Sequence, residues 1–174
     1  MGRGKASSIA GVFLGVSNVL VWTVLFNLAY RSFVERQREV ASLHDVKLVV
    51  NGMRIYLVDH DNSLPTAFSE ITRNVNANDL ALMPADKPHD ASGLNDYLSA
   101  TYVLAWPRRT HIDRIPQGAI VVYEPPTEHN HHQMTAALVD GEVRLFRENQ
   151  AKAVMSELQS GHNPPRNAVI DGAK

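Results

Sequence analysis

His129, His131 and His132 form the densest group of potential metal ligands in the sequence. Zn(II) or Cu(II) needs three or four donors that converge at about 2.0–2.2 Å. In an extended segment, His129 and His131 would share one side and His132 would point to the other. Glu124 or Glu128 could add an oxygen ligand. The same residues also fit a solvated, histidine-rich loop, because no second ligand pair with a familiar metal-site spacing occurs in the chain.

A second possible cation site combines Asp59, Asp61 and Ser63 with Glu70, which is the twelfth position counted from Asp59. This spacing imitates part of an EF-hand loop, but Leu64 stands where that loop needs glycine for a sharp turn. A helix end with polar capping residues explains the same positions without calcium.

The sequence contains no motif typical of catalysis. It has no Gly-rich phosphate loop, nucleophile elbow or His-Glu-x-x-His segment. His111 with Asp113, or Glu128 with His129, could be drawn as acid–base pairs, but such pairs are common on protein surfaces. Because there are no cysteines, disulfides, thiolate metal sites and cysteine nucleophiles are excluded. The net charge of −1 argues against a nucleic-acid-binding protein. We therefore expect neither an enzyme nor a cofactor.

Trp106, Arg108 and Arg109 place an aromatic side chain next to two cations. They could form an exposed contact surface. The alternative is a strand end at which Trp106 covers the core and the two arginines are solvated.

The 25 residues from Ala6 to Tyr30 carry no charged side chain. As a helix they would extend about 37 Å, which exceeds the roughly 30 Å of a hydrocarbon core. The run is also longer than the 7–15 apolar residues, roughly, of a signal peptide. It predicts an uncleaved, single-pass membrane anchor. Within it, Gly11 and Gly15 have a spacing that lets a second helix approach closely.

Apolar residues continue beyond this run at steps of three and four, which is the spacing of one helical face. They are Val40, Leu43, Val46, Val50, Met53 and Leu57. The pattern predicts one helix from about Ser8 to about Asp59. A short helix is expected at residues 66–72, and residues 74–99 are predicted as an irregular surface connection.

Four later runs have the composition of β-strands. They are Thr101–Trp106, Ala119–Glu124, Met134–Val139 and Glu142–Phe146. Asp140-Gly141 separates the last two and predicts a hairpin, in which both turn residues must accept positive φ. An amphipathic helix is expected over Asn149–Gln159 and should stop at Gly161.

These elements predict an α+β fold. A small antiparallel sheet cannot bury its apolar face alone, so the apolar face of residues 40–57 should cover it. The expected organisation is a short N-terminal segment (1–5), a transmembrane segment (6–30), a domain that includes the helix continuation (31–160) and a disordered tail (161–174).

A membrane-spanning helix that continues into a domain and is covered by a small antiparallel sheet resembles the plan of type IV pilins and type II secretion pseudopilins. The segment Asn51–Pro65 is similar to the helix end of bacterial pseudopilins, where a Tyr, an acidic or Asn pair and a Leu-Pro recur. The later segment resembles the prepilin-type processing-associated proteins, which are named for a His, nine residues and Asp-Gly. The matching positions here are Tyr123, Glu124, His129, Asp140 and Gly141.

Two features depart from that family pattern. Ten residues separate His129 from Asp140 and eight separate His131 from it, so Asn130 occupies the matching position. The chain also lacks a recognisable prepilin cleavage motif and the acidic residue that pilins carry within the span.

The resemblance implies a single-pass protein of the bacterial inner membrane with a cytoplasmic N-terminus and a periplasmic domain. The charges flanking the span do not choose an orientation by themselves. Expected partners are the lipid bilayer, other pilin-like or secretion-system proteins, and a second copy of the chain, and Gly11 and Gly15 would let a partner helix approach. The expected function is that of a membrane-anchored, pseudopilin-like structural or interaction protein of a type II secretion or type IV pilus-like system. The alternative is a membrane-tethered periplasmic module that binds a ligand or metal through residues 129–132.

Overall fold

The computed structural model describes residues 3–83, 90–106 and 108–166, with side chains from Val19 onward except that of His129. The chain divides into two units, Met1–Gln37 and Arg38–Lys174, and each is described by itself.

Helix α1 (Arg3–Asp59) supplies all the described structure of the first unit and the first element of the second. The prediction of one unbroken helix that ends at Asp59 is confirmed. After the helix, Asp61 and Asn62 adopt positive φ of 51° and 53°. The Asn62 N–H donates to the Leu57 carbonyl at 2.9 Å. Asp and Asn tolerate this left-handed conformation better than most residues, so they can end the helix here.

Among the residues that the structure describes, no helix meets the combined requirement of length and apolar character for crossing a membrane.

The second unit continues with two helices, four strands and five short 3₁₀ helices among its described residues. In chain order these are η1 (Phe68–Glu70), η2 (Thr72–Asn74), η3 (Ala77–Asp79), α2 (Ala91–Thr101), β1 (Val103–Leu104), η4 (Ile112–Arg114), β2 (Ile120–Glu124), η5 (Glu128–Asn130), β3 (Met134–Leu138), β4 (Val143–Phe146) and α3 (Glu148–Gln159).

The strands form one antiparallel sheet in the order β1-β2-β3-β4. The hairpin predicted between β3 and β4 is confirmed, and the Leu138 N–H donates to the Glu142 carbonyl at 2.8 Å. The expected turn geometry is wrong, because Gly141 (φ 86°) adopts positive φ and Asp140 does not. The turn is longer than the expected two-residue turn, and Gly141 is the residue in it that adopts the left-handed conformation.

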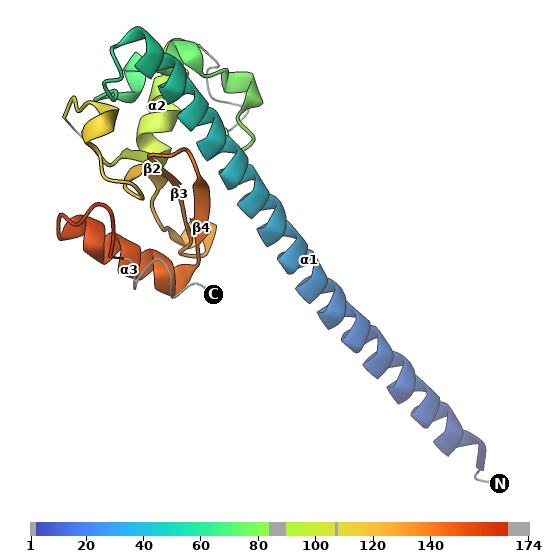
Figure 1. Cartoon of the computed structure of the whole chain (residues 1–174). Coiled ribbons are helices and arrows are strands. Elements are labelled where there is room, and N and C mark those ends of the chain that lie inside the picture. The colour runs from blue at the N-terminus through green and yellow to red at the C-terminus, as the bar shows by residue number, and fades with distance from the viewer. Residues whose placement is uncertain (1–2, 84–89, 107, 167–174) are drawn as a thin grey trace. The chain divides into compact units, whose positions relative to one another are not determined.

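Each face of the sheet packs against its own helices (Figure 1). One core joins the second-unit part of α1 and α2 to Val121, Val122 and Ala137. The other joins α3 to Ile120 and the opposite face of β3. The α+β class and the packing of residues 40–57 against the sheet are therefore confirmed.

The predicted apolar face of α1 is buried from Val46 onward, with Val50, Met53 and Leu57 all at most 7% exposed. The prediction is wrong for Val40, which is 64% exposed. The buried face also contains polar residues that the apolar pattern could not reveal.

The irregular connection predicted for residues 74–99 is wrong where α2 forms. Asp90 caps this helix by accepting a hydrogen bond from the Gly93 N–H at 2.8 Å, and Leu94, Tyr97 and Leu98 are buried. Residues 84–89 of that range lie outside the described residues. The strand predicted over residues 101–106 is only Val103–Leu104, because α2 continues through Thr101.

The disordered tail predicted from residue 161 starts too early. Gly161 (φ 80°) ends α3 as expected. Asn163 then exchanges two hydrogen bonds of 2.8 Å with the backbone N–H and carbonyl of Ile120. Residues 167–174 of the predicted tail lie outside the described residues.

Candidate functional site

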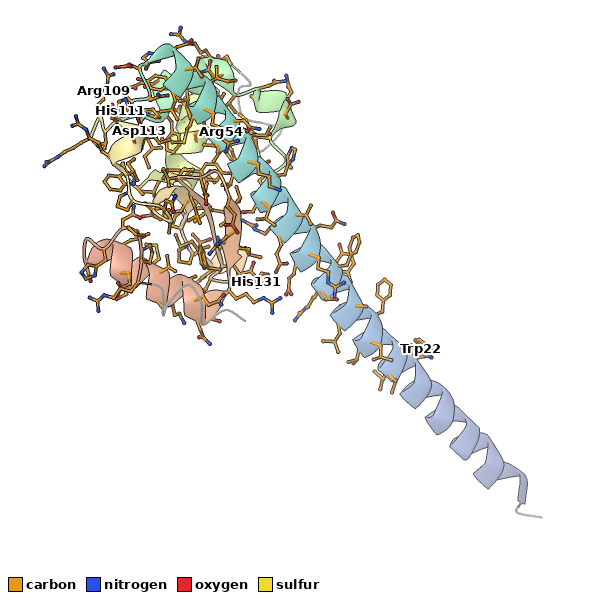
Figure 2. The ribbon with its side chains drawn as sticks, in the orientation of Figure 1. Trp22, Arg54, Arg109, His111, Asp113 and His131 are labelled. Atoms are coloured by element: carbon orange, nitrogen blue, oxygen red, sulfur yellow. The ribbon has the colours of Figure 1, made fainter. Side chains whose placement is uncertain are left out.

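The histidine segment follows β2 as η5 and a left-handed turn. His131, labelled in Figure 2, and His132 are exposed, and their φ angles are 53° and 58°. The extended alternation expected for this segment is therefore wrong. The side chain of His129 lies outside the described residues. Among the residues with described positions, no three His, Cys, Asp or Glu side chains gather as a group that could hold a metal. A metal site at this loop stays a prediction.

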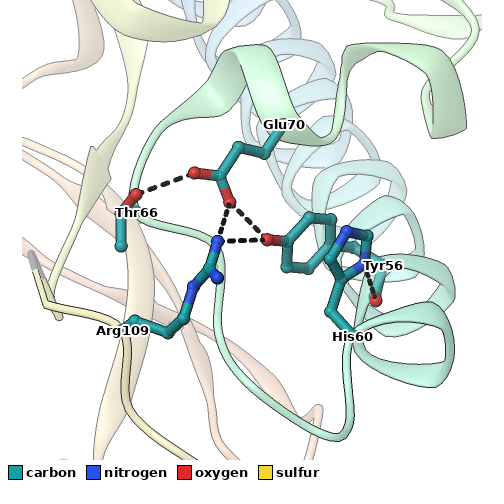
Figure 3. Close-up of polar contacts among 5 residues, drawn as sticks. All are labelled: Tyr56, His60, Thr66, Glu70 and Arg109. Atoms are coloured by element: carbon teal, nitrogen blue, oxygen red, sulfur yellow. Dashed lines mark hydrogen bonds and ion pairs between the residues drawn. The ribbon is translucent and has the colours of Figure 1, made fainter.

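The residues that imitate an EF-hand do not converge on one point. Glu70 instead joins a polar cluster with Tyr56, Thr66 and Arg109 (Figure 3). Its carboxylate accepts from the Tyr56 hydroxyl at 2.5 Å and from Thr66 at 2.8 Å. The Arg109 guanidinium lies 3.9 Å from the same carboxylate. The His60 ring stacks on Tyr56 with centroids 3.7 Å apart. These contacts tie the end of α1 to η1 and to the segment after β1.

Opposing effects act on the pKa of Glu70 in this cluster. Burial is the largest single effect and raises it. The hydrogen bonds from Tyr56 and Thr66 and the charge of Arg109 together outweigh burial, so the pKa is lowered from its ordinary value. The pKa of Tyr56 is raised, first by its burial and then by its hydrogen bond to Glu70. The cluster therefore favours an ionised Glu70 and a neutral Tyr56, which is a stable structural arrangement.

Glu124, one of the family-motif positions, lies buried between the sheet and α1. It is 6% exposed and accepts a hydrogen bond from the Ser42 hydroxyl. Ser42 shares a further hydrogen bond of 2.6 Å with Thr135. Tyr123, the neighbouring motif position, is only half-buried, and its side chain packs on the α3 side of the sheet. The buried polar group at Glu124 thus links α1, β2 and β3 in one network.

Asn130 also belongs to this hydrogen-bond network. Its side-chain amide donates to Glu124 at 3.3 Å and to the Pro125 carbonyl at 3.1 Å. Its side-chain oxygen accepts from the Thr127 N–H at 2.7 Å. Asn130 therefore closes the β2–β3 connection. Asn130 has the nine-residue spacing to Asp140, whereas His129 and His131 do not, but this spacing by itself does not predict the contacts of Asn130.

Asp140 and Gly141 dock on α1 at a second point. The Arg54 guanidinium donates to the Asp140 carbonyl at 3.1 Å. A Cβ added to Gly141 would collide with the end of the Arg54 side chain, and φ at this position is 86°. The positive φ is what requires glycine here, because the Arg54 guanidinium is the end of a flexible side chain and can move. Glu124, Asp140 and Gly141 thus contact α1, whereas Tyr123 packs on the α3 side of the sheet.

Asp45 is a buried polar residue that the sequence patterns missed. It is fully buried on α1 and accepts hydrogen bonds from the N–H groups of Ala81 (2.6 Å) and Leu82 (2.9 Å). Burial raises its pKa, although these two hydrogen bonds lower it in part. Nearby, burial raises the pKa of Tyr97 to about 12 and that of Tyr102 further. Asp45 therefore anchors the chain between η3 and α2.

The His111–Asp113 pair is a surface contact. His111 Nδ1 lies 3.2 Å from Asp113 Oδ2, and the Asp113 side chain is 74% exposed (Figure 2). An exposed pair of this kind has no fixed, desolvated geometry for proton transfer.

The first unit presents apolar side chains on all sides of α1. Four successive residues, Val19, Leu20, Val21 and Trp22, are 66%, 60%, 56% and 67% exposed. Successive residues of a helix point about 100° apart, so these four cover its whole circumference. Trp22 is labelled in Figure 2. Gly11 and Gly15 lie within α1, and the side-chain surroundings of this part lie outside the described residues.

Comparison with known proteins finds no match. No family model, no curated protein and no solved structure is similar enough to identify the chain or its fold. The resemblance to pilin-like proteins therefore stays a prediction from the sequence.

Proposed function

We propose that the chain is a membrane-anchored, pilin-like structural or interaction protein. In this proposal the charge-free run of α1 lies in the bilayer and associates laterally with other helices. The second unit folds in water and contacts partner proteins of a secretion or pilus-type assembly of the bacterial inner membrane.

The exposed apolar surface of the first unit carries the proposal. Leaving a large aliphatic or aromatic side chain in water rather than in an apolar environment costs about 1.5–3 kcal/mol. Leu25, Phe26 and Leu28 continue the exposed surface after Trp22, at 50%, 71% and 59%. A surface of this kind needs lipid or partner helices around it. The charge-free run itself begins at Ala6, whereas the structure describes side chains only from Val19 onward.

The polar side chains within this run are compatible with lipid. The Thr23 hydroxyl donates to the Val19 carbonyl and the Asn27 amide donates to the Thr23 carbonyl, both at 2.8 Å. A polar side chain that bonds to its own helix leaves fewer unpaired groups in an apolar solvent. This pattern supports insertion of the run in a bilayer.

The second unit supports an interaction role over catalysis. Its buried polar groups join elements of the fold, as Glu124 joins β2 to Ser42 of α1. A helix that serves as the support of an antiparallel sheet is also the arrangement that the pilin-like resemblance implies.

Membrane anchoring is tested by extracting membranes of bacteria that express the full chain with alkaline carbonate. The chain should stay in the membrane pellet. Leu25→Asp places a charge in the apolar run and should shift the chain toward the soluble fraction. Val58→Asp is the control, because Val58 is 81% exposed in the second unit. Complete release of the unchanged chain would contradict the anchor.

Lateral association is tested with single cysteines, because the natural chain has none. Cysteine is introduced in turn at positions 19, 20, 21 and 22, and the membranes are mildly oxidised. A helix–helix interface occupies one face of the helix. Disulfide-linked dimers of the chain, or disulfides between the chain and another protein, should therefore form strongly at one or two of these positions. Equal cross-linking at all four positions, or none, would contradict a specific helix partner.

A further inference from the structure

We propose that a groove beside β1 binds an extended, acidic segment of a partner protein, which adds to the free edge of the sheet. All residues of the groove belong to the second unit. The proposal therefore goes beyond the proposed membrane function and can fail or succeed separately from it.

The groove has a volume of about 560 Å³ and lies between β1 with the residues that follow it and the end of α3. Leu104, Trp106, Tyr123 and Leu158 give it an apolar lining. The Trp106 indole N–H donates to the Ile120 carbonyl at 3.0 Å, which fixes the orientation of the ring. A groove of this size and composition can take a few apolar side chains.

The edge of the sheet runs along this groove. β1 is the terminal strand, and no described strand lies on its other side. The Ala105 N–H donates to the Val121 carbonyl of the β2 segment at 3.0 Å. Backbone groups of an antiparallel strand alternate in direction, so the N–H and C=O of Leu104 point away from β2. Val103 is 39% exposed at this edge. An extended segment could pair with these groups and place alternate side chains in the groove.

Charge favours an acidic segment. Arg108 lines the groove and is exposed, and the described lining residues include no Asp or Glu. Arg109 follows it and is also exposed, at 62% of its side chain. Carboxylates on the outer face of an added strand would meet Arg108, whereas Arg109 is already paired with Glu70. Complementary charge of this kind sets the choice of partner more than the total affinity.

The binding experiment uses the full chain with Trp22→Phe, so that Trp106 is the only tryptophan. The probe is a blocked hexapeptide, Glu-Val-Glu-Val-Glu-Val, and the matched control peptide has Lys in place of Glu. The acidic peptide should change the Trp106 fluorescence in a saturable way. The basic peptide should bind about two- to fivefold more weakly, as expected for an exposed charge pair.

Two variants locate the site. Arg108→Glu should reverse the preference between the two peptides, whereas Arg114→Glu, an exposed arginine outside the groove lining, should leave it unchanged. Leu104→Pro removes the outward N–H and should abolish peptide binding. Its thermal unfolding is measured in parallel, and the Arg108→Glu result stands by itself if this variant is unfolded.

Four results would overturn the proposal. The first is no saturable response, and the second is equal binding of the two peptides. The third is peptide binding only after removal of residues 167–174, which would make the chain's own end the occupant. The fourth is dissociation of a dimer of the chain by the peptide, which would make a second copy the occupant.

Discussion

The two parts of α1 use the same backbone conformation in opposite ways. Between Val19 and Gln37, large apolar side chains are exposed on every side, as at Leu25 and Phe26. From Arg38 to Asp59, apolar side chains are buried along one face, and Val46 and Val49 are fully buried. In our proposal lipid or partner helices surround the first part, whereas the sheet and α2 cover the apolar face of the second.

Polar side chains follow the same division. In the first part, the Ser32 hydroxyl donates to the Ala29 carbonyl of its own helix at 2.9 Å. In the second part, Ser42 bonds to Glu124 and Asp45 bonds to the backbone of Ala81 and Leu82. The periodic sequence pattern therefore predicts that a helix forms. Whether the helix packs within the domain or stays exposed depends on which groups its side chains contact.

The largest effect should come from a charge in the buried face. Val49→Asp would bury an unpaired carboxylate and should destabilise the second unit by more than about 3 kcal/mol. Leu25→Asp, in the first part, should leave the unfolding transition of the second unit in place. Circular dichroism melts of the detergent-solubilised full chain check both. A normal melt for Val49→Asp would remove the distinction between the two parts.

The second-largest effect on stability should distinguish Ser42, in the second part of α1, from Ser32, in the first part. Ser42→Ala removes the hydroxyl that donates to buried Glu124 and should cost about 2–3 kcal/mol. Ser32→Ala, which loses only a bond to its own helix, should change stability by less than about 0.5 kcal/mol. Urea unfolding measures the difference. Equal costs for the two variants would mean that the Glu124 network does not stabilise the fold.

A smaller effect tests how the β3–β4 hairpin is fastened to α1. Gly141→Ala and Gly161→Ala both force alanine into positive φ, at 86° and 80°. Only the first also displaces Arg54, whereas nothing lies within 4 Å of the added Cβ at Gly161. Gly161→Ala should cost about 1 kcal/mol, and Gly141→Ala about 0.5 kcal/mol more, because the displaced Arg54 loses its exposed hydrogen bond to Asp140. The difference should vanish in an Arg54→Ala background.

The smallest effect is the pH dependence at the end of α1. Because the pKa of Glu70 is lowered on folding, its contribution to stability is present above its ordinary value of 4.5 and is lost as pH falls through the lowered value. The pKa of Asp45 is raised on folding, so its contribution to stability has the opposite pH dependence. That contribution is present at low pH and is lost as the pH rises through the raised pKa. Glu70→Gln should therefore lower the melting temperature by about 1–2 °C at pH 7, and this difference should shrink as the pH falls below 4.5 and through the lowered pKa. A difference in melting temperature that grows as the pH falls would contradict the lowered pKa of Glu70.

Much of the fold could be predicted from patterns that depend on neighbours in sequence. The end of α1, the β3–β4 hairpin and the stop of α3 at Gly161 follow from local conformational preferences. The helix α2 could not be predicted in this way, because its stability depends on Tyr97 and Leu98 packing into a distant core. The same holds for Asn130, whose role became clear only from its contacts with Glu124 and Pro125.

The chain carries one tryptophan in each unit, which allows the central claim to be measured directly. Single-tryptophan versions of the full chain, Trp106→Phe and Trp22→Phe, are reconstituted in vesicles that contain lipids brominated on the acyl chain. Our account predicts strong quenching and a blue-shifted emission for Trp22, and no bromine quenching for Trp106. A Trp22 that escapes the brominated lipid and stays open to aqueous quenchers would contradict it.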